Sequence, residues 1–207
     1  MPTAKKLVAL LHRHGSTLNN ELNQYRSHLD PSLDAKGVEQ AEESADFLEK
    51  YDIEKIVTSP MLRAYQTASI TYTRFPHVPF IQDRGLMPWN LGFLAGKDRD
   101  TFAEILQFYV DNPYKTVPQG DALDVFKQRT EQFFTQEFEK DEGLTMYCCH
   151  TSNIITLSNL LSGDSTMQAE RHEAVGPGGI LAIFEGGGGL EMEPIYGEAK
   201  PQTYGVS

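Results

Sequence analysis

Residues 5–20 read KKLVALLHRHGSTLNN, an apolar run that ends abruptly in a basic, hydrogen-bonding cluster. Unbroken apolar character over residues 7–11 is typical of a strand that is covered on both faces, as in a parallel sheet. Gly15 then allows a sharp turn of the backbone directly after Arg13 and His14. Because open α/β sheets bind ligands beyond the carboxyl ends of their strands, we expect a site around His14.

Segments with strand and helix character alternate along the rest of the chain. Short apolar runs predict strands at 53–58, 78–82, 144–149 and 179–184. Helical periodicity predicts helices at 34–51, 121–140 and 153–161. This alternation predicts an α/β fold of three layers, α/β/α, with a mostly parallel central sheet and right-handed crossovers.

The length of the chain suits one domain. We expect a single domain over residues 1–207, in which the irregular segment 83–120 forms a small cap over the site. Residues 18–32 contain Asp30-Pro31 and are expected to be loop. The sequence carries no signal for an oligomeric state.

Capping residues predict where the helices begin. Asp34 is expected to cap the first helix. Ser59-Pro60 predicts another helix start, with Ser at the N-cap and Pro at the first helical position. Thr151 or Ser152 is expected to cap the helix that follows the strand at 144–149.

The composition excludes several classes of partner. A formal net charge of −11 and a pI near 4.9 oppose binding to nucleic acid and to anionic membrane surfaces. No apolar run approaches the ~20 residues that a membrane-spanning helix requires, and the N-terminal MPTAKK lacks a signal-peptide core. Adjacent Cys148 and Cys149 are expected to be buried thiols, which fits a reducing, cytoplasmic location. Any anion site must therefore be a local concentration of Arg and His.

Three basic features follow predicted strands, and parallel strands share their carboxyl-terminal edge. They are Arg13-His14, Arg63 in the first turn of a helix, and His150. Their convergence predicts a compact cationic pocket in which the two imidazoles lie within about 8 Å of each other. Guanidinium groups suit bidentate contact with phosphate oxygens, and helix N-termini add backbone donors.

A pocket of this composition predicts phosphoryl transfer through a covalent histidine. Neutral His14 would attack phosphorus, while Arg13, Arg63 and a protonated His150 hold the charge of the equatorial oxygens. Water would then hydrolyse the phosphohistidine. Because the fixed positive charge is high, we expect no metal and no other cofactor, and the predicted partner is a small phosphorylated substrate.

Further motifs accompany these residues in a fixed order. They are Arg13-His14-Gly15 followed by Asn20, LDAKG at 33–37 with Gln40-Ala41, TSP at 58–60 with Arg63-Ala64 and QTA at 66–68, Leu91-Gly92 with Gly96, PQGD at 118–121, and His150. Over residues 7–185 the sequence thereby resembles the histidine phosphatase superfamily, in its phosphoglycerate-mutase-like branch. The resemblance implies that His14 is the phosphorylated nucleophile and that Arg13, Arg63 and His150 clamp the phosphate, with Asn20 assisting.

The sequence departs from the family pattern at the expected proton donor. The family usually carries a Glu four residues before the glycine that is here Gly92, and that position is Pro88. Proline has no proton to transfer. The acid-phosphatase branch has an aspartate after its second histidine, where this sequence has Thr151. We expect Thr151 to bind substrate together with Asn20.

The missing Glu leaves three interpretations open. Another carboxylate, Asp83, Asp98 or Asp121, would serve as general acid, and of these Asp121 matches the family's Gly-Glu position; or the substrates carry good leaving groups; or the pocket binds phosphate without catalysis. The favoured interpretation is a metal-independent phosphatase of phosphomonoesters that acts through His14. The alternatives are a phosphohistidine or acyl-phosphate phosphatase and a non-catalytic, phosphate-binding regulatory protein. Mutase activity is less expected, because the long loop insertions of the cofactor-dependent mutases are not evident.

Overall fold

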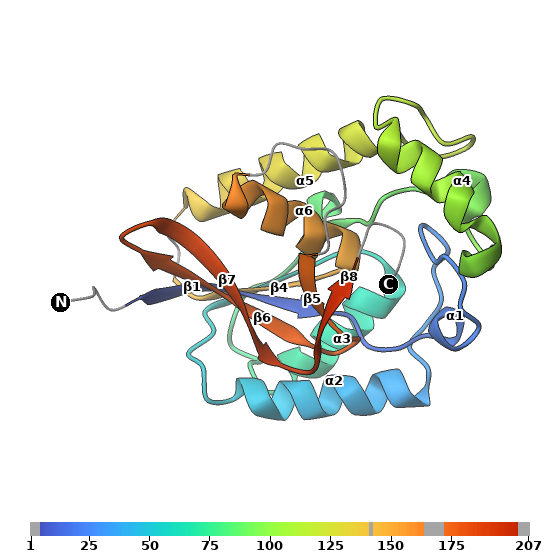
Figure 1. Ribbon diagram of the computed structural model, residues 1–207. Helices are drawn as coiled ribbons and strands as arrows, with labels where there is room; N and C mark the ends of the chain where they lie inside the picture. Colours follow the sequence, from blue (N-terminus) through green and yellow to red (C-terminus); the bar gives the residue numbers. More distant parts are fainter. Residues whose placement is uncertain (1–4, 141–142, 164–171, 203–207) are drawn as a thin grey trace.

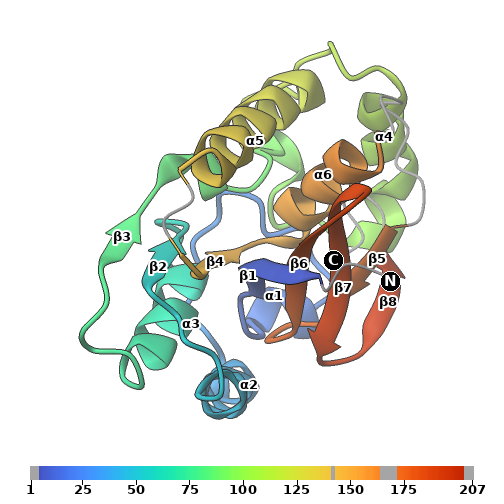
Figure 2. The same ribbon diagram turned by 90° about the vertical axis from the view of Figure 1, so that its left-hand side faces the viewer.

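A six-stranded sheet forms the centre of the computed structural model, which describes residues 5–140, 143–163 and 172–202 (Figures 1 and 2). The strand order is β3-β2-β4-β1-β6-β7. Strands β3, β2, β4 and β1 are parallel, whereas β6 runs antiparallel to β1 and β7 antiparallel to β6. Their bounds are β1 Lys6–Arg13, β2 Lys55–Thr58, β3 Phe80–Gln82, β4 Thr145–Cys149, β6 Ile180–Gly186 and β7 Gly189–Tyr196. The predicted α/β class with a mostly parallel sheet is confirmed.

Helices cover both faces of this sheet (Figure 1). On one face lie α2 (Ala35–Leu48) and α3 (Leu62–Tyr72), and on the other α5 (Leu123–Phe138) and α6 (Thr151–Ser162). A separate two-stranded sheet pairs β5 (His172–Val175) with β8 (Ala199–Gln202). Among the described residues, no helix combines the length and apolar character needed to cross a bilayer.

Strand β1 contributes side chains to the apolar cores on both faces of the sheet, because successive side chains of a strand point to opposite faces. Leu11 packs with Phe134 and Ile154 on the side of α5 and α6. Leu10 packs with Leu48 on the side of α2 and α3. Both leucines are fully buried, and burying such a side chain contributes about 1.5–3 kcal/mol. The apolar run that opens the sequence is therefore the centre of two cores.

The segment 83–120 packs around a third apolar core. It contains the short turns η1 (Arg84–Leu86) and η2 (Gly92–Leu94) and the helix α4 (Arg99–Asp111). Trp89, Leu94 and Leu106 are buried there against Phe126 of α5. Figure 1 shows α4 on the side of the molecule toward which β1 points.

Three helix starts differ from the sequence prediction. Residues 18–32 are not all loop, because Thr17 and Asn20 form a capping box around the short α1 (Leu18–Glu21). Helix α3 begins after Met61 and not at Pro60, since the Ser59 hydroxyl accepts a hydrogen bond from the Met61 N–H. The N-cap of α6 is His150 itself, one residue earlier than predicted. The Asp34 cap of α2 is confirmed, with its carboxylate accepting from Gly37 N–H.

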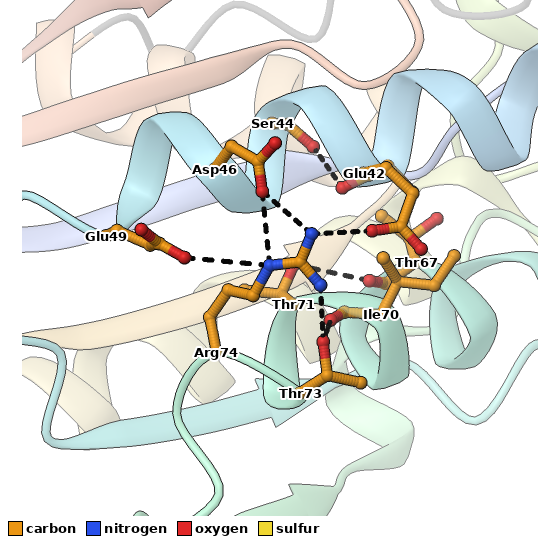
Figure 3. A network of polar contacts seen from close by, with 10 residues as sticks. Glu42, Ser44, Asp46, Glu49, Thr67, Ile70, Thr71, Thr73 and Arg74 are labelled. Atoms are coloured by element: carbon orange, nitrogen blue, oxygen red, sulfur yellow. Dashed lines mark hydrogen bonds and ion pairs between the residues drawn. The ribbon is translucent and has the colours of Figure 1, made fainter.

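An ion-pair network joins the far ends of α2 and α3 (Figure 3). Arg74 follows α3, and its guanidinium donates to Glu42 and Asp46 of α2, each at 2.7 Å. A third carboxylate, that of Glu49, lies 3.7 Å from its Nε. This contact ties α3 to α2 at the end opposite Arg63.

Candidate active site

The strand register brings the two predicted histidines together. Arg13 pairs with Cys149 across the parallel strands β1 and β4, so the next residues, His14 and His150, leave the sheet at the same edge. Their ring centroids lie 5.1 Å apart, within the predicted distance, and both side chains are buried.

The hydrogen bond of His14 determines its tautomer. Nδ1 lies 2.7 Å from the carbonyl oxygen of Gly15, and a carbonyl can only accept, so Nδ1 carries the proton. The lone pair of the neutral ring is therefore on Nε2. The turn that holds this ring is itself fixed: Gly15 N–H donates to the Thr67 hydroxyl at 3.0 Å and Ser16 N–H to the Gln40 amide oxygen at 2.9 Å.

Close backbone packing explains why the turn needs glycine. A Cβ on Gly15 would collide with the backbone carbonyl of Gly37 at the start of α2. A Cβ on Gly37 would collide with the Ser16 backbone in turn. The glycines of the RHG and LDAKG motifs thus let β1 and α2 cross at contact distance beneath His14.

His150 keeps one nitrogen available. Its Nε2 shares a hydrogen bond of 2.9 Å with the hydroxyl of Ser59, the residue after β2. Its Nδ1 is buried and has no hydrogen-bond partner among the described residues. A buried nitrogen without a protein partner is costly unless a ligand supplies one.

A narrow pocket of about 50 Å³ opens above both rings. None of the described side chains that line it is a carboxylate. Its walls come from the strand ends, from the loop after α1 and from the segment 83–120. The lining residues are His14, Tyr25, Arg26, Ser27, Arg63, Pro88, Trp89, Leu91, Arg99, His150, Thr151 and Ser152.

Both predicted arginines donate hydrogen bonds to backbone carbonyls. Arg63 lines the pocket and donates to the carbonyl oxygens of Leu29 at 2.9 Å and Ser27 at 3.0 Å. Arg13 donates to the Val175 carbonyl at 2.7 Å and stands behind the lining. Burial lowers the pKa of Arg63 to about 10 and that of Arg13 to about 9.

Sequence reasoning missed two further arginines. Arg26 and Arg99 both line the pocket, and Arg26 is almost completely buried. Burial, followed by the charges of Arg13, Arg63 and Arg99, lowers the pKa of Arg26 well below its usual value. Neither residue follows a core strand or belongs to a matched motif, so no local signal in the sequence identifies them.

Burial and the surrounding positive charge favour neutral imidazoles, which opposes the protonated His150 that the sequence analysis expects. Burial lowers the pKa of His14 well below 6.5, and the positive charges of Arg26 and Arg63 lower it further. Burial, then Arg63 and Arg26, has the same effect on the pKa of His150. At neutral pH the Nε2 lone pair of His14 is therefore unprotonated.

Of the other residues predicted for the site, one lines the pocket and two lie outside its lining. Thr151 lines the pocket, and its hydroxyl has no hydrogen-bond partner in the described part of the chain. Asn20 does not line this pocket, and its side-chain oxygen accepts from the N–H and the hydroxyl of Thr17. Asp121 does not line it either; its negative charge acts on His28 and Arg129. The roles assigned to these residues stay predictions.

Pro88 lies in the pocket wall with its backbone firmly held. Its carbonyl oxygen accepts from His28 Nε2 at 3.1 Å and from Arg129 at 3.2 Å. Arg129 also donates to the Met87 carbonyl at 2.7 Å.

Within the described residues, no group of three or more His, Cys, Asp or Glu side chains is arranged to hold a metal ion.

The family model of the histidine phosphatase superfamily (branch 1) matches residues 9–190, and the chain belongs to this superfamily. Its relatives include phosphatases and mutases. It is 28% identical over 110 residues to a 5''-phosphoribostamycin phosphatase of Niallia circulans, covering 52% of this chain and 49% of that protein. It is 28% identical over 162 residues to a 2,3-bisphosphoglycerate-dependent phosphoglycerate mutase of Chlamydia pneumoniae, covering 61% and 70% of the two chains. The chain thus spans about half the length of the first relative.

The fold is shared with solved structures. The crystal structure of the alpha-ribazole phosphatase from Shigella flexneri superimposes with a TM-score of 0.76 at 22% identity, over 91% of this chain and 95% of that one. At this identity the likeness concerns the fold alone.

Proposed function

We propose that this protein is a phosphatase that hydrolyses phosphomonoesters through a phosphohistidine on His14. The observation that carries the proposal is the state of this ring: its Nδ1 proton is held by the Gly15 carbonyl and its Nε2 lone pair is free, beside His150 and a buried arginine cluster. An unprotonated imidazole next to fixed positive charge is suited to attack a phosphoryl dianion.

The phosphoryl group would be bound by charge and by unpaired donors. Arg63 and Arg26 supply guanidinium groups, with the charge of Arg13 behind them. His150 Nδ1 and the Thr151 hydroxyl lack partners among the described residues and supply further hydrogen bonds. The N-terminus of α6, a helix of 12 residues, adds backbone N–H groups.

The reaction proceeds in two displacements. In the first, the lone pair of His14 Nε2 forms a bond to phosphorus, and the bond from phosphorus to the leaving oxygen breaks with its electron pair on that oxygen. In the second, a water oxygen attacks the phosphohistidine and the N–P bond breaks, which returns the lone pair to Nε2. The proton lost by water passes to the phosphate or to solvent.

A second candidate function is hydrolysis of acyl phosphates or phosphohistidine. It is favoured by the pocket lining, which has Pro88 and no carboxylate among the described residues. General acids contribute about 10²–10⁴-fold when the leaving group must be protonated, and acyl phosphates do not need this help. A third possibility, a regulatory protein that binds phosphate without turnover, predicts anion binding but no covalent adduct.

Trapping the intermediate tests the proposal. Wild-type protein mixed with radiolabelled p-nitrophenyl phosphate and quenched rapidly should carry a label that is acid-labile and base-stable. The label should be absent from His14→Ala and present in His77→Ala, a matched change of an exposed histidine. Label retained in His14→Ala, or none in the wild type at any substrate concentration, would overturn the assignment.

Relative rates then separate the first two candidates. If acetyl phosphate is hydrolysed faster than p-nitrophenyl phosphate and alkyl phosphates do not react, the result supports the acyl-phosphate activity. Comparable kcat/KM on alkyl and aryl phosphates supports a general phosphomonoesterase with a proton donor such as Asp121.

A further inference from the structure

The pocket has two sides that differ in chemistry. The floor, His14 with His150 and Arg63, comes from the ends of the strands and the first turn of α3. A second group of lining residues comes from the loop after α1 and from the segment 83–120; we call Tyr25, Arg26, Pro88, Trp89 and Arg99 of this group the roof.

In-line displacement decides which side meets the leaving group. The entering and leaving atoms lie on opposite sides of phosphorus in phosphoryl transfer. Because the entering atom is Nε2 of His14 in the floor, the leaving oxygen lies on the side of phosphorus that faces away from His14, and the roof is the part of the lining that the floor does not supply. The ionisable residues of the roof therefore determine how its charge is handled.

Those ionisable residues are a tyrosine and two arginines. The Tyr25 hydroxyl already donates to the Arg99 carbonyl at 3.3 Å, which leaves its proton engaged. Pro88 has no proton to give. The charge of Arg26 acts on both imidazoles, whereas the charge of Arg99 acts on Arg26 and Arg13. Both arginines line the pocket, and of the two it is Arg26 whose charge acts on His14 and His150.

We infer that Arg26, together with Arg99, stabilises the negative charge of the leaving oxygen and so takes the place of a proton donor. The inference rests on the proposed phosphatase function. When the P–O bond breaks, the electron pair stays on the oxygen, which departs as an anion beside the Arg26 guanidinium and takes a proton from solvent afterwards. In a narrow pocket lined by buried side chains such a contact is stronger than in water.

This arrangement defines a substrate class. A cation stabilises a leaving anion without protonating it, so substrates whose leaving groups are stable anions react best. Phosphate esters of phenols and mixed anhydrides with carboxylic acids belong to this class. Esters of simple alcohols, whose alkoxides are strong bases, react poorly.

A series of aryl phosphates tests the role of Arg26. The leaving groups run from dinitrophenol to phenol, and kcat/KM reports phosphorylation of His14, the step in which they depart. We expect kcat/KM of the wild type to fall as the phenol becomes less acidic. In Arg26→Gln the fall should steepen, with a loss of about 10²-fold for phenyl phosphate and about ten-fold for the dinitrophenyl ester.

Matched variants isolate the effect of charge. Arg26→Lys should restore the wild-type slope even where it lowers every rate, and Arg99→Gln should steepen the slope less than Arg26→Gln. Arg74→Gln, a change of an arginine remote from the pocket, should leave the slope unchanged. If Arg26→Gln does not fold, as thermal melting would show, the slopes of Arg26→Lys and Arg99→Gln decide the question.

Two results would overturn the inference while leaving the phosphatase intact. One is an equal loss in Arg26→Gln for all leaving groups, which would mean that Arg26 binds only the phosphoryl oxygens. The other is a flat wild-type series, which would reveal proton transfer to the leaving group. Absence of a His14 adduct in the wild type would instead overturn the proposed function, and the inference with it.

Discussion

The two ends of helix α3 carry arginines that are balanced in opposite ways. Arg74, just past its last turn, lies at the surface among the carboxylates of Glu42, Asp46 and Glu49 (Figure 3). Hydrogen bonds to Asp46 and Glu42 raise the pKa of its guanidinium. Arg63, in the first turn, is buried and donates to two backbone carbonyls, and burial lowers the pKa of its guanidinium.

The opposite environments of these two arginines indicate different roles. Arg74 makes a surface contact that stabilises the fold, whereas Arg63 belongs to a site suited to bind an anion. Positive charge at the surface is neutralised by side chains at little desolvation cost. Buried positive charge without a carboxylate is unfavourable unless an anion compensates it. In the pocket, Arg26, Arg63 and Arg99 lie together with no carboxylate in the described lining, so a bound phosphoryl group would supply a negative charge that the lining itself lacks.

The largest expected effect is a fall in kcat/KM when an arginine of the pocket is replaced. Arg63→Gln removes a guanidinium from the floor of the pocket and the bonds to Ser27 and Leu29, so kcat/KM should fall about 10²–10³-fold. Arg74→Gln removes the same kind of side chain from the other end of α3 and should leave kcat/KM near the wild-type value. Steady-state kinetics on p-nitrophenyl phosphate measures both. Similar losses in the two variants would mean that the arginines of α3 act through the helix and not through the pocket.

The next effect is on stability in the presence of anions. Orthovanadate or phosphate should raise the free energy of unfolding by about 2.7 kcal/mol at about 100 times its Kd, because it binds the folded pocket alone. Thermal melting with increasing anion measures this shift. The shift should persist in Arg74→Gln and largely disappear in Arg63→Gln. A shift of equal size in both variants would point to general salt stabilisation.

The pH profile should show a smaller effect. His14 must be neutral to attack, and its lowered pKa keeps it neutral as the pH falls through 6.5. The acid limb of kcat/KM should therefore lie below pH 6.5 in the wild type. Arg26→Gln removes one of the charges that lower the pKa of His14, so the acid limb of this variant should move up toward pH 6.5. A limb that stays in place would show that the charge of Arg26 does not contribute to this pKa.

The smallest effect belongs to the surface network. Arg74→Gln should lower the unfolding midpoint slightly at low ionic strength, by less than the anion shift, since exposed ion pairs contribute little. Added salt should narrow the difference between variant and wild type, because it screens exposed charges. Thermal melts at two salt concentrations measure this. A salt-independent difference would indicate lost packing and not lost charge.

Residues next to core strands were predictable, whereas residues in the loops were not. His14 and His150 directly follow β1 and β4, whose apolar runs are visible in the sequence, and Arg63 lies in the first turn after β2. Arg26 and Arg99 lie in irregular segments. The positions of these two segments depend on contacts between residues far apart in the chain. For example, the Ser27 hydroxyl accepts a hydrogen bond from Leu91 N–H and donates one to the Trp89 carbonyl.

The sequence by itself determined the α/β class, the parallel pairing of the core strands and the edge at which two histidines and two arginines gather. These follow from short-range patterns, namely apolar period, capping residues and glycine turns, which act within a few residues. Tertiary structure alone decided that Arg26 and Arg99 join the pocket and that Asn20 and Asp121 stay outside it. The physical reason is that loop conformations are selected by hydrogen bonds and packing between segments far apart in the chain, and no local pattern encodes them.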